Sequence, residues 1–202
     1  MKSIKDLLIV PFLFLNSTAH SQLVIHSPQS LVDLFPAVSA DENDGLIDCS
    51  YANFGFVPYG HAMVSRTNIF YLNFLSPLLQ LGRVYFDPLL DTVCDTLPEQ
   101  EFKLRATKEK DDYSDEEIEI FLPPFMVADR GDCSFVKKVR NMEEAGVALA
   151  IIVDNKNENI DDIVMSDDGT GAGIRIPSVL ISKTDGEKLT NFMRTASQEE
   201  LD

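Results

Sequence analysis

Between Phe125 and Ser182, apolar and polar stretches alternate in an order that predicts strand, turn, helix, strand, loop and strand. The first strand, Phe125–Ala128, leads into a polar turn at Asp129–Asp132. Ser134 is placed to cap the helix, and Gly146 follows its end, where a left-handed backbone is needed. Apolar residues recur at the spacing of one helical face at Phe135, Val136, Val139, Met142 and Ala145.

Two short apolar runs follow the helix. Val147–Val153 is continuous and rich in β-branched residues, which is typical of a strand buried on both faces. Ile174–Ile181 is a second run, in which Pro177 predicts an edge or a bulge. The pair Thr184 and Glu187 has the spacing of a capping box and predicts the start of a last helix.

The N-terminus has the pattern of a secretory signal peptide. Lys2 and Lys5 form a basic region, and Leu7–Leu15 is an apolar run too short to span a bilayer. Small residues at Ala19 and Ser21 predict cleavage after Ser21, so that residues 1–21 are removed. An amphipathic N-terminal helix or an uncleaved anchor is the alternative.

A second apolar stretch, residues 65–81, interrupts the pattern of the chain and contains no acidic residue. One interpretation is a loop that faces a membrane or a partner, which would be prone to aggregation. The other, which we favour, is a retained intron, because Val64-Ser65 can be encoded by a splice-donor-like stretch and Leu79-Gln80 by an acceptor-like one.

The charge of the chain limits its partners. A formal net charge of −16 over 202 residues makes nucleic acid a poor partner, since backbone binding needs a basic face. The run 103–119 is polar and mostly acidic, and we expect a solvated loop. It lacks the ligand spacing of an EF-hand, so no metal or other cofactor is predicted.

No motif for catalysis is present: the sequence contains neither HExxH nor GxSxG, so we do not expect an enzyme. His61 titrates near lumenal pH, but we favour a loop histidine without a role.

Several motifs together resemble the protease-associated (PA) domain. They are Arg130-Gly131-x-Cys133-x-Phe135, Ala145-Gly146 and Ile176-Pro177. The segment Asn53-Phe54-Gly55, followed by Tyr59-Gly60, is similar to the start of the luminal PA domain in plant-type vacuolar sorting receptors.

The resemblance implies an α+β fold whose β-sheets form a sandwich or open barrel flanked by a few α-helices. It also implies a disulfide between Cys94 and Cys133. Cys49 is then left over, either as a buried apolar residue or as a thiol that is free or lacks its partner. The expected organisation is a signal peptide (1–21), an N-terminal segment (22–46) that opens with an edge strand, a PA domain (47–194) and a C-terminal tail (195–202).

By the same resemblance, the chain is a non-catalytic luminal or extracellular module that recognises sorting peptides on soluble vacuolar or lysosomal hydrolases. Full-length relatives are single-pass membrane proteins of the Golgi, endosome or vacuole. The alternative is the PA accessory domain of a truncated membrane RING-type ubiquitin ligase or of a peptidase. The candidate ligand-binding residues are Arg130 with Asp129, Gly131 and Asp132, and two flanking loops, Tyr59-Gly60-His61 and Met165-Ser166-Asp167. Arg130 beside a helix N-terminus can hold a carboxylate or carbonyl, or it can simply pair with Asp129, Asp132 or a loop carbonyl.

Overall fold

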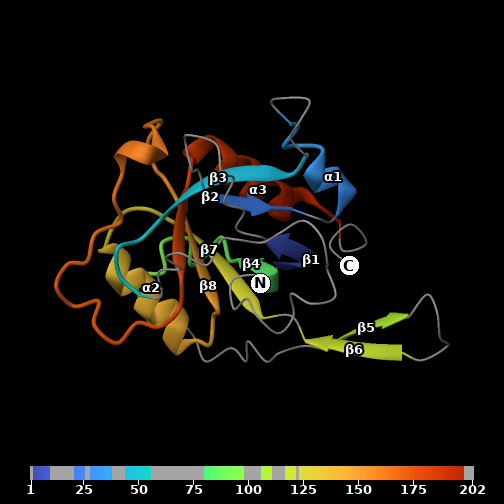
Figure 1. Cartoon of the computed structure of the whole chain (residues 1–202), viewed down its shortest axis with the longest axis horizontal. Helices are drawn as coiled ribbons and strands as arrows, with labels where there is room; N and C mark the ends of the chain where they lie inside the picture. Colours follow the sequence, from blue (N-terminus) through green and yellow to red (C-terminus); the bar gives the residue numbers. More distant parts are fainter. Residues whose placement is uncertain are drawn as a thin grey trace, which may run out of the picture.

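The computed structural model describes residues 2–9, 21–25, 28–37, 44–55, 80–97, 106–110, 117–121 and 123–197. Its centre is a seven-stranded mixed sheet in the order β1-β4-β7-β8-β9-β3-β2 (Figure 1). The strands of this sheet are β1 (Lys2–Ile9), β2 (Ser21–Val24), β3 (Leu46–Tyr51), β4 (Gln80–Phe86), β7 (Pro124–Asp129), β8 (Leu149–Val153) and β9 (Ser178–Ile181). The helices are α1 (Gln29–Val32), α2 (Phe135–Glu144), the 3₁₀ turn η2 (Ile160–Asp162) and α3 (Lys183–Thr195).

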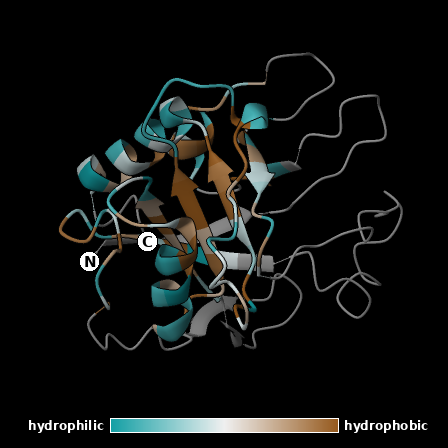
Figure 2. Ribbon diagram, turned by 90° about the vertical axis from the view of Figure 1, so that its left-hand side faces the viewer, coloured by the Kyte–Doolittle hydropathy of each residue, from teal (hydrophilic) through white to brown (hydrophobic). Residues whose placement is uncertain are grey.

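Four neighbouring strands, β4, β7, β8 and β9, run parallel, and the strands outside them pair antiparallel. All five residues of β8 are buried, because helices cover both faces of the sheet. Figure 2 shows this arrangement, with hydrophobic strands in the centre and largely hydrophilic helix surfaces outside. The expected α+β fold is confirmed.

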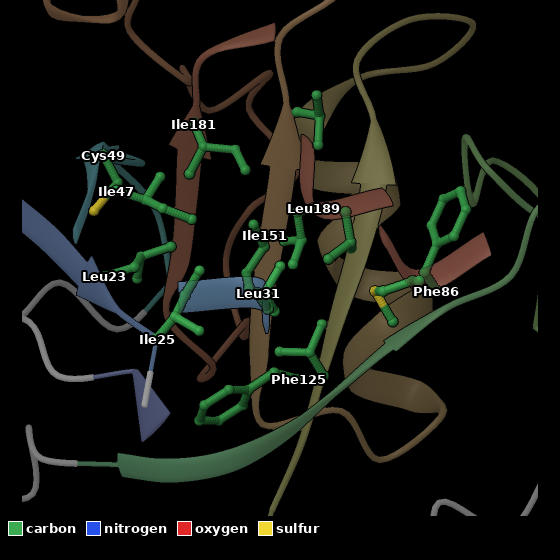
Figure 3. Close-up of a cluster of buried hydrophobic side chains, with 14 of the residues drawn as sticks. Leu23, Ile25, Leu31, Ile47, Cys49, Phe86, Phe125, Ile151, Ile181 and Leu189 are labelled. Carbon is green, nitrogen blue, oxygen red and sulfur yellow. The ribbon is translucent and has the colours of Figure 1, made fainter. Parts of the chain in front are cut away.

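Side chains alternate between two cores, as the two-residue period of strands requires. One core lies between the sheet and α1 and α3, and Figure 3 shows part of it: Leu23, Ile25, Leu31, Ile47, Phe86, Phe125, Ile151, Ile181 and Leu189. The other lies under α2 and contains Met126, Ala128, Val136, Val139, Met142, Ala150 and Ile152. In the first core α3 approaches β8 closely at Gly186, where an added Cβ would lie 2.1 Å from a methyl group of Val153.

The predicted ends of α2 are confirmed. The Ser134 hydroxyl accepts a hydrogen bond from the Lys137 backbone N–H, and Gly146 has φ of +90°. For α3 the predicted cap is wrong. The cap is Ser182, two residues before Thr184; its hydroxyl accepts the Asp185 N–H at 3.0 Å, and the helix begins at Lys183.

Pro177 marks neither an edge nor a bulge. It precedes β9, which is an inner strand between β8 and β3, and its carbonyl accepts the Ala150 N–H. A proline is tolerated here because it lies just before the first residue of the strand. The edge strand expected near Gln22 is present as β2.

Three segments bear on the organisation predicted from the sequence. Residues 2–9, the start of the predicted signal peptide, form the edge strand β1. The acidic run 103–119, expected to be a loop, contains β5 (Ala106–Lys110) and the start of β6 (Glu117–Phe121), which form a two-stranded sheet. In their register Lys108 is paired with Glu119 and Lys110 with Glu117. The apolar insert lies outside the described residues except for the first two residues of β4.

Candidate functional site

The candidate site is a turn at the carboxyl ends of the parallel strands β7 and β8, where open parallel sheets bind ligands. The Arg130 N–H donates to the Val153 carbonyl at 2.8 Å, and the Asn155 side chain donates to the Arg130 carbonyl at 3.1 Å. Gly131 and Asp132 both have positive φ, +129° and +63°. The turn is therefore held to β8 on one side and leads directly into α2 on the other.

The Arg130 guanidinium is already in contact with acidic groups. It forms a 2.6 Å salt bridge with Asp154, whose side chain is fully buried, and lies 3.6 Å from Glu158. It also lies 5.7 Å from the centre of the Phe135 ring. Its acidic partners are thus not Asp129 or Asp132, the two considered from the sequence. The Arg130 side chain remains 26% exposed, so a ligand can still reach it.

The disulfide that the resemblance implies is present: Cys94 and Cys133 are bonded, with Cα atoms 5.7 Å apart. Beneath it lies Lys138, which is fully buried and donates to the Thr92 carbonyl and to the Cys94 sulfur at 3.3 Å. Burial lowers the pKa of Lys138, although nearby aspartates oppose that shift. A lysine on the buried side of α2 therefore fixes the loop that carries the disulfide.

Two hollows flank Arg130. One, of about 470 Å³, lies toward α3, and its lining includes Thr92, Asp129, Asp154, Glu187 and Arg194. The other, of about 450 Å³, lies along the turn from Gly131 to Phe135, and Asn155 and Lys156 also line it. Arg130 and Asn155 line both hollows, and Arg130 is the cation that the two hollows share.

Asp129 faces the first of these hollows. Its backbone N–H donates to the Asp91 carbonyl at 2.7 Å. Burial raises the pKa of Asp129, and the Asp91 carboxylate raises it further. The anionic form of Asp129 is therefore less favourable in the folded protein than in the unfolded chain, although Arg194 and Lys138 partly oppose this shift.

The loop predicted to flank the turn does come close to it. A hydrogen bond from Ser134, the cap of α2, lowers the pKa of Asp168. The Asp167 N–H donates to the Asn53 side chain at 2.8 Å, and the Asn53 N–H donates to the Met165 carbonyl. The Met165 side chain is fully buried, so only its backbone can face a ligand. Ser166 is exposed.

Asn53 is a residue whose role the sequence did not reveal. In the sequence it belongs to the family motif, and in the structure it anchors the loop after β8. The other two residues of the motif are structural: Phe54 is buried under α2, and Gly55 has φ of +71° with the Ile176 carbonyl packed against it. The Tyr59-Gly60-His61 loop lies outside the described residues.

Within the described ranges, no cluster of three or more histidine, cysteine or acidic side chains is arranged to hold a metal ion. Among those same residues, no helix has both the length and the apolar character that crossing a membrane requires. Cys49 is buried, and burial raises the pKa of its thiol.

Residues 100–189 match the family model of the PA domain, so the chain contains a PA domain, as its motifs indicated. The chain is similar to vacuolar-sorting receptor 2 of Arabidopsis thaliana, with 26% identity over 72% of this chain and 20% of that protein. It is also similar to receptor homology region, transmembrane domain- and RING domain-containing protein 1 of Oryza sativa subsp. japonica, with 42% identity over 34% of this chain and 12% of that protein.

The chain spans only 12% to 24% of the length of the first curated relatives it matches. A solved zinc aminopeptidase from Bacillus subtilis shares 33% identity over 33% of this chain and 16% of its own, with a TM-score of 0.29, and this similarity carries no argument about chemistry.

Proposed function

We propose that this chain is a non-catalytic PA domain that binds peptide segments of other proteins at the Arg130 turn, in the lumen of the secretory pathway or outside the cell. The similarity to vacuolar-sorting receptors supports cargo recognition. The predicted signal peptide and the disulfide support an oxidising compartment. Soluble hydrolases that carry sorting peptides are the expected cargo.

The observation that carries this proposal is the position of Arg130 between two open hollows. A guanidinium that is partly exposed can donate to a ligand carboxylate or carbonyl while it keeps its bond to a buried carboxylate. Of its two acidic partners, Asp154 is fixed in the interior, whereas Glu158 is 44% exposed and more distant. A ligand therefore displaces Glu158 and leaves the pair with Asp154 intact.

Glu158→Ala tests this directly, because it removes the competing carboxylate without touching the buried pair. We expect calorimetry with hydrolase-derived peptides to show tighter binding to this variant. Asp162→Ala is the matched control, since it removes the same charge from an exposed position in the same loop. Arg130→Lys keeps the charge but loses the planar fork, and weaker binding is expected. Unchanged affinity in both Glu158→Ala and Arg130→Lys would remove Arg130 from the binding site.

A second candidate is the accessory PA domain of a membrane RING-type ubiquitin ligase or of a peptidase. It is favoured by the 42% identity to the rice RING protein and by 36% identity over 32% of the chain to signal peptide peptidase-like 3 of Arabidopsis thaliana. The two candidates share the peptide site and differ in the domains joined to it. Sequencing the full transcript decides between them, because a RING or peptidase segment in frame downstream would establish the second.

A further inference from the structure

Among the described residues, the outer edge of β4 pairs only with the start of the predicted signal peptide (the leader). Residues 2–9 form β1, which pairs antiparallel with β4 over Gln80–Phe86. β1 also contacts β2 and α3, so it lies in a slot between β4 and β2 of the curled sheet (Figure 1). If the leader is removed after Ser21, this slot loses its strand, and β4 becomes an edge.

The hydrogen-bonding groups of that edge can be assigned. Successive backbone groups of a strand point to opposite sides. Because the Arg83 N–H donates to Pro123, next to β7, at 2.9 Å, the N–H groups of Val84 and Phe86 point the other way, toward β1. Removal of the leader leaves this row of donors and acceptors unpaired, and an unpaired row is a template for another strand.

The side chains around the slot specify what fits it. Val84 and Phe86 are buried in the core under α3, and the Arg194 guanidinium lies 4.9 Å from the centre of the Phe86 ring. A strand that pairs here should therefore be apolar at the position opposite Val84, where β1 has Ile4. On the other face Arg83 is 4% exposed, and its Nε has no hydrogen-bond partner among the described residues. An acceptor side chain is favoured on that face.

We propose that this slot, emptied by removal of the leader, binds an extended peptide segment of a partner protein, which adds antiparallel to β4. This mode takes its affinity from main-chain hydrogen bonds and its specificity from alternate side chains. A second copy of this chain is a poorer occupant, because its β4 would bring another Arg83 to a face that already holds one buried cation. The proposal does not depend on the function proposed at the Arg130 turn, although Arg194, which lies over the Phe86 ring, also lines the hollow toward α3.

The leader sequence itself supplies a probe. The full chain is expressed in a secreting eukaryotic host, and the secreted protein is sequenced from its N-terminus, where we expect Gln22. A labelled peptide with the sequence of residues 2–9, blocked at both ends, is then titrated by fluorescence anisotropy. Two N-methylated forms of this peptide are compared. In the register of β1, Ile4 is opposite Val84 and its N–H faces β4, whereas Ser3 is opposite Tyr85 and its N–H faces away.

We expect the plain peptide and the N-methyl-Ser3 peptide to bind alike, and the N-methyl-Ile4 peptide to bind at least about tenfold more weakly. Glu158→Ala, which acts at the Arg130 turn, should leave all three affinities unchanged. The proposal is overturned if no peptide binds, if the two methylated peptides bind equally, or if Glu158→Ala alters their affinity. It is also overturned if the secreted chain retains residues 2–9, or if it is a dimer that excludes the peptide.

Discussion

Truncation of Arg130 to alanine should destabilise the fold, and this effect has to be separated from any effect on binding. The substitution leaves the fully buried Asp154 carboxylate with only one other contact among the hydrogen bonds described, the Lys156 backbone N–H at 3.2 Å. Breaking a fully buried ion pair costs about 3–5 kcal/mol. Because Arg130 is 26% exposed, water can enter the vacated space, and we expect a loss of about 2–3 kcal/mol.

A double-mutant cycle with Asp154→Ala isolates the contribution of the Arg130–Asp154 ion pair to the free energy of unfolding. Once the carboxylate is gone, the loss of Arg130 should cost less than about 1 kcal/mol, since only an exposed contact with Glu158 and the stacking on Phe135 remain. The free energy of unfolding is measured in urea by far-UV circular dichroism, because the chain contains no tryptophan to report by fluorescence.

The expected coupling between the two sites is about 1.5–3 kcal/mol. If the costs of the two single substitutions simply add, the buried pair does not hold the turn and the reasoning fails. Binding to Arg130→Ala should be measured without urea, after circular dichroism has shown that the variant is folded under those conditions.

Three further predictions concern single groups. Asp129→Asn should raise the melting temperature at pH 7. Burial, and then the charge of Asp91, raises the pKa of Asp129 in the folded protein above its value of about 3.9 in the unfolded chain. The wild type therefore loses stability as the pH rises from the unfolded-state pKa through the folded-state pKa. An equal melting temperature at neutral pH would contradict it. Ser134→Ala should cost about 1 kcal/mol through the lost cap and raise the pKa of Asp168, measured by NMR titration; an unchanged titration would disprove the contact. Cys49 should react with iodoacetamide only after denaturation, because burial raises the pKa of its thiol, and rapid labelling of the native protein would refute this.

The central fold could be predicted because its signals are local. The period of α2, its serine cap and the continuous apolar run of β8 each depend on fewer than about fifteen consecutive residues. The prediction of the α3 cap was wrong because two overlapping patterns compete: Ser182 and Asp185 have the same spacing as Thr184 and Glu187. Only the end of β9 at Ile181 decides between them, and that end depends on pairing with β8.

The partner of Arg130 was missed for a different reason. In the structure Asp129 is in register with Val153, so the next residues of the two strands, Arg130 and Asp154, meet at the sheet edge. The sequence contains both segments, but their alignment depends on long-range parallel pairing. The burial of Lys138 could have been predicted from its spacing, because it lies three residues after Phe135 and four before Met142 on the apolar face of α2, whereas Lys137 lies on the opposite face. The pairing of residues 2–9 with β4, by contrast, was hidden, since a short apolar run with flanking lysines satisfies both a leader and an edge strand.

The geometry of the turn also limits what Arg130 can contribute to a ligand. One side of its guanidinium is committed to Asp154, so a ligand gains only the difference between its own contact and the one with Glu158. An exposed ion pair such as the latter contributes about 0–1 kcal/mol, and a charge-assisted hydrogen bond contributes about 1.5–3 kcal/mol. The net gain is therefore about 1–2 kcal/mol, which corresponds to roughly tenfold in affinity. A peptide that binds this domain tightly must draw most of its affinity from the two hollows and their flanking loops, with Arg130 fixing its position between them.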